Sequence, residues 1–481
     1  MRGRLEGWCG GAGGGVDGVD GEHQAQRKYV PRKRETVLQV ALQEGLPALL
    51  ESTAETGGLP GFVVREFRAA TTCGDVEQGF AWVKCNQCGE ELHVAFTCRA
   101  RTVCPSCTAR RAACTAAHLV DQVLPEVAYR QWTLAFPRSL KLGLAWNPAL
   151  LGAALRVFVA GLFAWQRRRA RELGSEAPKA GAIAFVQNFT GALLLHPHAH
   201  VLVPEGVFRG EDATFVPLPP PDDAEVEALL RKVARKVVKL AQAAYPDGLP
   251  HAQDAQAVLA AASVQTKLPW GDEEPAWPRK ERRCAFLEGF SLHANTWVHA
   301  NDRASLETLC RYGARGPLTL ERLSLREDGK LLYRLKKPAP GGASTLVMTP
   351  LQLLKRLCAL VLKPRLHLTR FFGVFAPNAN ARAAVVSQRP LPPPPPCSPP
   401  APTAQGILLP APPPPPPRPT LNWADLLRRT WGFDVFACPC GGRRRIIAFI
   451  SSPSVARKVL GLPAPRPRPQ PTGPPQLALP L

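Results

Sequence analysis

The run Leu195-His196-Pro197-His198-Ala199-His200-Val201-Leu202-Val203 decides how the central part of this chain folds. A β-strand turns successive side chains to opposite faces, so His198 and His200 emerge on the same face. The apolar residues that follow favour a buried strand, and Pro197 places the start of its paired part near His198. Two imidazoles roughly 7 Å apart on one rigid face form half of a divalent-metal site. The alternative is a set of surface histidines at a strand entrance.

The charge balance indicates the kind of partner. The 481 residues include 60 Lys and Arg against 38 Asp and Glu, a formal net charge of +22. A basic excess spread along a chain favours a polyanion, most often nucleic acid, although a solvated basic surface is the alternative. The cluster Arg167, Arg168 and Arg169 is one candidate for phosphate contacts.

The cysteines and the apolar stretches indicate the compartment. No apolar leader is visible in the glycine-rich first twenty residues, and paired cysteines without a secretory signal favour metal ligation in a reducing cytoplasm. The longest apolar stretch, 148–165, contains Arg156 and leads into the Arg167 cluster. We therefore expect a buried or amphipathic helix there, with no membrane contact, and a cytoplasmic protein.

The composition changes along the chain predict its domains. Strand-like and helical runs alternate through the middle, which indicates an α+β fold with a largely antiparallel sheet. The expected parts are a disordered basic tail (1–36), a cysteine-rich zinc-binding domain (37–125), a central sheet domain (126–385), a proline-rich linker (386–420), a small C-terminal module (421–462) and a disordered tail (463–481).

Two Cys-x-x-Cys pairs, Cys85 with Cys88 and Cys104 with Cys107, are separated by fifteen residues. This spacing is typical of a tetrahedral structural zinc site in which each pair supplies two thiolates. Four thiolates leave no open position, so such a site does not itself indicate catalysis. Three further residues are alternates or parts of a second site, although a lone cysteine is more often a small buried residue: Cys73, Cys98 and His118.

Of the five tyrosines, Tyr312 has the most suggestive surroundings. A helix is predicted after the N-cap candidate Asp302, and Tyr312 falls at the flank of its apolar stripe. Arg311 and Arg315 lie close enough in sequence to favour a phenolate and a phosphate. A tyrosine can open a phosphodiester bond by forming a phosphotyrosine link. The alternative is an amphipathic tyrosine at a helix edge.

Taken in order, these segments resemble the HUH-type rolling-circle transposases of the insertion-sequence ninety-one family. That family combines an N-terminal zinc-binding domain with a domain that has a His-hydrophobe-His motif and a tyrosine nucleophile. The resemblance spans residues 73–378 and, more weakly, 421–460. It rests on these segments: Arg99 to Arg111, Phe185-Val186-Gln187, His198-Ala199-His200 with Glu205 to Phe208, Phe290 to Ala294, Leu309 to Tyr312, and Gly373 to Asn378.

The resemblance implies roles for individual residues. His198 and His200 match the metal histidines and Tyr312 the nucleophile, while His293 and Gln187 are candidates for a third ligand. Thr308 stands where some members have a second tyrosine, which implies a single-tyrosine version. His196 is expected to take no part. Cys438-Pro439-Cys440 is one residue shorter than the family's Cys-x-x-Cys pair, which puts a second zinc site in doubt.

The implied activity is cleavage and transfer of single-stranded DNA at transposon ends through a 5′-phosphotyrosine. Structural Zn²⁺ and catalytic Mg²⁺ or Mn²⁺ are the implied metals, and the bacterial nucleoid is the implied location. A non-enzymatic zinc-ribbon DNA-binding protein and an inactive transposase copy are the alternatives. A plasmid replication initiator or relaxase is disfavoured because the cysteine module and the C-terminal segments resemble the transposases.

Overall fold

A computed structural model describes residues 36–248, 254–266, 282–336, 338, 342–387 and 423–463. The two predicted tails and the proline-rich linker lie outside these ranges, apart from one or two residues at their ends. The chain divides into two compact units. The larger contains the chain up to Thr71 and Arg99–Phe433, and the smaller contains Thr72–Cys98 and the chain from Asp434.

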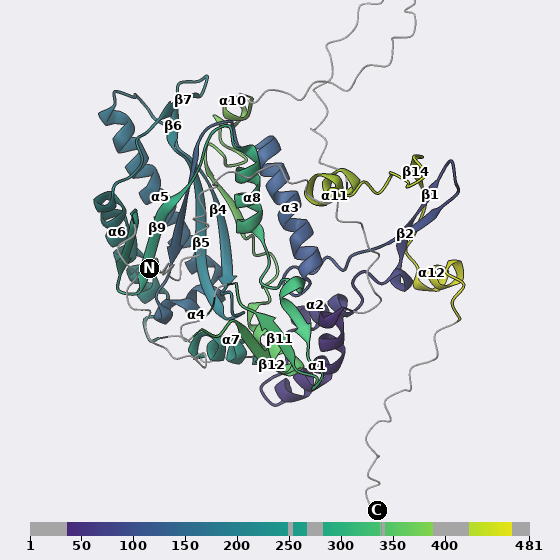
Figure 1. Cartoon of the computed structure of the whole chain (residues 1–481). Helices are drawn as coiled ribbons and strands as arrows, with labels where there is room; N and C mark the ends of the chain where they lie inside the picture. The colour runs from purple at the N-terminus through teal and green to yellow at the C-terminus, as the bar shows by residue number, and fades with distance from the viewer. Residues whose placement is uncertain are drawn as a thin grey trace, which may run out of the picture. The chain divides into compact units, whose positions relative to one another are not determined.

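An antiparallel six-stranded sheet is the centre of the larger unit (Figure 1). In spatial order its strands are β13 (Thr369–Gly373), β4 (Gly181–Phe189), β5 (Leu195–Pro204), β3 (Tyr129–Ala135), β9 (Phe290–Val298) and β8 (Cys284–Leu287). The predicted α+β class with an antiparallel sheet is confirmed. Pairing of β5 with β3 starts at His198, as Pro197 predicted, whereas β4 reaches Leu195 past an irregularity in register.

Helices α4 (Arg138–Trp146), α5 (Pro148–Glu172) and α6 (Asp223–Ala244) pack on one face of this sheet. Ala199, Val201 and Val203 of β5 contribute to the core that these helices close. By length and composition α5 could cross a membrane. However, its apolar side lies in this core, from Leu150 to Leu162, as expected of a core helix in a soluble domain.

Helices α3 (Pro105–Gln122) and α8 (Arg303–Ala314) pack on the opposite face. Leu119, Leu306 and Cys310 meet the strand residues Phe185 and Leu202 there. The backbone of α8 approaches β4 closely because Gly313 has no side chain: a Cβ at this position would lie 2.7 Å from the ring of Phe185.

The remaining elements of the larger unit surround these layers. They are α1 (Val37–Ala54), α2 (Gly61–Thr71), α7 (Ala255–Gln265), α9 (Pro350–Leu360), α10 (Arg382–Ser387), α11 (Trp423–Trp431), the hairpin β6 (Gly206–Arg209) and β7 (Thr214–Pro217), the 3₁₀ turn η2 (Leu320–Arg322), and the small sheet β10 (Leu323–Leu325), β11 (Leu331–Arg334) and β12 (Thr345–Met348).

The smaller unit is a three-stranded antiparallel sheet in the order β14, β1, β2. Its elements are η1 (Val76–Gln78), β1 (Phe80–Cys85), β2 (Glu91–Ala95), β14 (Arg444–Ile450) and α12 (Pro453–Val459). We expected residues 421–462 to form a module of their own. Instead, β14 pairs with β1 of the cysteine-rich region, and α11 belongs to the larger unit.

The close approach at Gly313 leads to a stability prediction. Gly313→Ala is expected to cost about 1–3 kcal/mol, because the added methyl collides with Phe185 in a packed layer. The measurement is the thermal midpoint of the purified chain. Gly191→Ala is the matched control, because a Cβ there meets open space. An equal midpoint for the two variants would contradict the packing argument.

Candidate metal centre and nucleophile

Three histidine rings follow one another along the β5 face that meets α3 and α8. The ring centroids of His196 and His198 are 5.3 Å apart, and those of His198 and His200 are 5.0 Å apart. Burial lowers the pKa of His198 to about 4 and holds that of His200 well below its usual value. Both rings are therefore neutral near pH 7, the form that ligates a metal. His196 lies in the same row, although we expected it to take no part.

Hydrogen bonds orient the two predicted ligands in the same way. Nδ1 of His198 donates to the carbonyl oxygen of His196 at 2.8 Å, and Nδ1 of His200 contacts the hydroxyl of Thr133 at 3.1 Å. A bond at Nδ1 leaves Nε2 as the metal-binding atom and holds the ring in place. Nε2 of His200 is buried and has no hydrogen-bond partner within the described parts of the chain. This nitrogen is therefore suited to bind a metal ion.

Tyr312 reaches the histidine row from the last turn of α8. Its ring centroid is 5.8 Å from that of His200. The helix begins at the N-cap Asp302, which accepts from the Ser305 N–H as the sequence indicated. Two cations lie over the phenol ring, Arg315 at 4.6 Å and Lys336 at 5.1 Å from the centroid. The sequence reasoning missed Lys336, because no local pattern connects it with Tyr312.

Gln187 connects strand β4 beside the histidine row with the end of α8. It lies opposite His198 in the pairing of β4 with β5. Its side-chain nitrogen donates to the carbonyl oxygens of Tyr312 and Gly313, at 2.8 and 3.0 Å. The buried amide thus binds two carbonyls of the last turn of α8, where the regular intrahelical hydrogen bonds end; the Tyr312 carbonyl also accepts from the Arg315 N–H at 3.5 Å.

A cavity of about 400 Å³ opens beside the end of α8. Its lining includes Gly313, Phe189 and four arginines: Arg101, Arg111, Arg315 and Arg365. Nε of Arg315 is buried and without a hydrogen-bond partner among the described residues. Guanidinium groups suit phosphate oxygens, so the cavity is a suitable place for a nucleic-acid backbone. Apart from Arg315, these arginines were not among the predicted site residues.

Two other predicted residues, His293 and Arg311, are not among the contacts of the Tyr312 ring. His293 shares the sheet face with His200, but β3 separates them, since both residues pair with Thr133. His293 contacts Cys284 at 3.2 Å, and burial lowers its pKa to about 4. Arg311 is half-buried in the last turn of α8.

The arginine cluster of α5 belongs to the layer on the other side of the sheet. Arg168 and Arg169 form ion pairs with Glu225 of α6 at 3.2 and 3.5 Å. Arg167 is their neighbour on the same helix. The structure therefore does not bring these three predicted DNA-binding residues together with the histidines.

The cysteines are grouped differently from the prediction. Within the smaller unit Cys85 and Cys88 meet Cys438 and Cys440, and the four sulfur atoms lie within 4.8 Å of one another. Cys104 and Cys107, which we assigned to the same ion as Cys85 and Cys88, belong to the larger unit and are not part of this group. Spacing alone predicts that each pair binds metal but does not say which pairs come together. His118 is not part of the group either.

The histidine row predicts how stability depends on pH. The folded pKa of His198, about 4, lies below its ordinary value, so its contribution is complete above about pH 6.5 and is lost as the pH falls toward 4. We expect the thermal midpoint of the metal-free protein to fall between pH 7 and pH 5, and to fall less in His198→Gln. An equal decrease in both proteins would contradict this cause.

Comparison with known families separates the chain into two matched regions. Residues 46–136 match the model described as "Transposase zinc-binding domain", and residues 181–383 match the model described as "Putative transposase". The histidine row, Gln187 and Tyr312 fall in the second region, and Cys438 and Cys440 fall in neither. Comparison with the curated proteins and with the solved structures gives no match.

The order of the matched regions is the one expected from the sequence, with a zinc-binding domain ahead of a transposase domain. The zinc-binding domain and the cysteine groups indicate structural zinc. A transposase binds DNA, in keeping with the charge of +22. The chain belongs to the transposases of the insertion-sequence ninety-one family.

Proposed function

We propose that this transposase nicks and transfers single-stranded DNA through a covalent 5′-phosphotyrosine on Tyr312, by an HUH-type, rolling-circle-like mechanism. The observation that carries the proposal is the 5.8 Å separation between the rings of Tyr312 and His200, which come from a helix and a strand far apart in sequence. The catalytic domain in this proposal is 126–385, with 37–125 as the zinc-binding domain.

His198 and His200 hold a divalent ion, Mg²⁺ or Mn²⁺, through their Nε2 atoms. The donor set fits, because both Nδ1 atoms are engaged and Nε2 of His200 is buried without a partner among the described residues. Gln187 is the better placed of the two candidate third ligands, since it pairs with His198 on the adjacent strand while His293 lies beyond β3. When bound, the ion polarises the scissile phosphate as a Lewis acid.

Tyr312 carries out the bond exchange, and two neighbouring cations stabilise the charge that develops. The Tyr312 oxygen attacks phosphorus, a P–O bond forms, the bond to the 3′ oxygen breaks, and the phenolic proton passes to solvent. The leaving 3′ oxygen takes up a proton and becomes a free hydroxyl that can attack again. The cations over the phenol ring, Arg315 and Lys336, favour the negative charge that develops during attack.

The basic cavity beside α8 holds the backbone of the DNA strand next to Tyr312. Arg315 connects the cavity with the nucleophile, since it lines the cavity and also lies over the Tyr312 ring. Arg101, Arg111 and Arg365 supply further positive charge along the same wall. Contacts of this kind position a strand without reading its sequence. We place the reaction at transposon ends in the bacterial cytoplasm, on the nucleoid.

Tyr312→Phe is expected to abolish the covalent adduct with a single-stranded oligonucleotide in Mn²⁺ or Mg²⁺, because the attacking oxygen is gone, while binding persists. The adduct is measured by denaturing gel electrophoresis. Tyr245→Phe is the matched control: its hydroxyl lies 3.5 Å from the Gly143 carbonyl, in the layer of α4 to α6.

The controls also separate the competing functions. A persistent adduct in Tyr312→Phe would refute the assignment of Tyr312 as the nucleophile. DNA binding by the wild-type chain without any adduct or nick, in either metal, would favour a non-enzymatic zinc-ribbon protein or an inactive copy.

Gln187→Ala tests the connection between strand and helix. It removes two hydrogen bonds to the end of α8, so we expect adduct formation to fall at least tenfold, as for a misplaced reacting group. Gln166→Ala is the matched control, because this buried glutamine also binds two carbonyls, those of Pro204 and Gly206, in the layer of α5.

The two glutamine variants should lose similar stability, by thermal midpoint. Equal adduct formation in them would show that Gln187 has only a structural role.

A further inference from the structure

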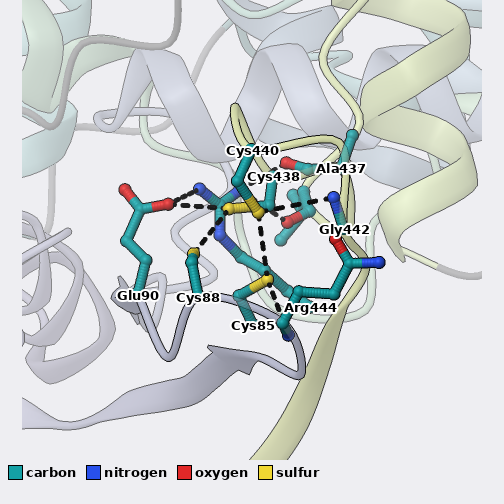
Figure 2. Close-up of polar contacts among 10 residues, drawn as sticks. Cys85, Cys88, Glu90, Ala437, Cys438, Cys440, Gly442 and Arg444 are labelled. Atoms are coloured by element: carbon teal, nitrogen blue, oxygen red, sulfur yellow. Dashed lines mark hydrogen bonds and ion pairs between the residues drawn. The ribbon is translucent and has the colours of Figure 1, made fainter.

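The sheet of the smaller unit brings together cysteines that are far apart in the sequence. Cys85 is the last residue of β1, and Cys88 lies in the turn that follows. Cys438 and Cys440 lie in the turn before β14, whose first residue, Arg444, pairs with Cys85. Figure 2 shows the four sulfur atoms gathered between these two turns.

The distances fit one tetrahedral ion. The Cys85 and Cys440 sulfur atoms are 3.6 Å apart, as are those of Cys88 and Cys438, and all four lie within 4.8 Å of one another. Four thiolates bound at about 2.3 Å to a central zinc have sulfur atoms about 3.8 Å apart. A disulfide would need about 2.05 Å, and none joins these residues.

The main chain of both turns supports thiolates in the same way. The N–H of Gln87 points to the Cys85 sulfur at 3.4 Å, and the N–H of Gly442 points to the Cys440 sulfur, also at 3.4 Å. In each turn the donor lies two residues after the acceptor. Gly442 is also required for space, because a Cβ there would lie 2.9 Å from the Cys85 sulfur.

The charges around the group are suited to a zinc tetrathiolate, whose net charge is −2. Arg444 is 7% exposed and donates to Glu90 at 2.7 Å, next to the sulfur atoms. The thiol of Cys438 donates to the same Glu90 carboxylate at 2.9 Å, and zinc loading releases this proton. The Arg444 guanidinium then offsets the charge of the Glu90 carboxylate beside the thiolates.

We propose that Cys85, Cys88, Cys438 and Cys440 bind a structural Zn²⁺ that joins the C-terminal strand β14 to the β1 turn. The one-residue spacer at Pro439 is compatible with this site, because Cys438 faces Cys88 while Cys440 faces Cys85. Cys85 and Cys88 lie within the matched zinc-binding region, whereas Cys438 and Cys440 lie outside it. The site therefore adds ligands from the C-terminal segment to that region.

The first test is the zinc content of the purified full chain, measured by elemental mass spectrometry. We expect Cys438→Ser and Cys440→Ser to hold one zinc ion fewer than the wild type, and the control Cys114→Ser, whose exposed cysteine is not part of the group, to hold as many as the wild type. Cys438→His should restore the wild-type content, because imidazole replaces thiolate as a zinc ligand. A wild type without zinc, or a wild-type zinc content in both serine variants, would overturn the proposal.

The second test uses the wild type alone and so does not depend on whether a variant folds. Cys88 and Cys440 are exposed, as is Cys114. With zinc bound, iodoacetamide should modify Cys114 and spare Cys88 and Cys440, and a chelator should make all three react, as mapped by peptide mass spectrometry. Equal modification of the three cysteines before chelation would overturn the site. Neither test measures DNA cleavage, so both are independent of the proposed function.

Discussion

The alternation of side chains along β5 is the constraint on which the larger unit depends. Ala199, Val201 and Val203 enter the core under α5 and α6, so His198 and His200 must emerge on the face that α3 and α8 cover. A slip of one residue would bury imidazoles in that core and turn valines toward Tyr312. The register is therefore specified by apolar burial, and the histidine row is its consequence.

Close packing then places Tyr312, the proposed nucleophile. Without a Cβ at Gly313, α8 approaches Phe185 of β4, and the Gln187 amide binds the carbonyls at the end of the helix. The contacts that set the Tyr312 position are thus contacts of the protein with itself. In the proposed reaction, a tyrosine held in this way would lose little freedom on reaching the attacking geometry.

The smaller unit depends less on apolar burial than the larger unit does. Phe80 and Val83 of β1 are buried, but Ile447 and Phe449 of β14 are 54% and 67% exposed, so one face of β14 adds little to a core. Small units with a limited core depend on other interactions for their stability, and metal sites are a common one. The proposed zinc of Cys85, Cys88, Cys438 and Cys440 would supply such an interaction between β1 and the C-terminal segment.

The sequence by itself determined the class of fold, the common face of His198 and His200 on β5, the nucleophile candidate and the metal-binding character of the cysteine pairs, because strand alternation and short spacings act locally. Only the tertiary structure decided which cysteines come together, that Lys336 lies over the Tyr312 ring, that Arg101 lines a cavity with Arg315, and that Arg167 to Arg169 lie in the other layer. These facts follow from strand pairing and helix packing between distant segments. A local sequence pattern gives no information on the distance between such segments, because the packing of the whole core determines that distance.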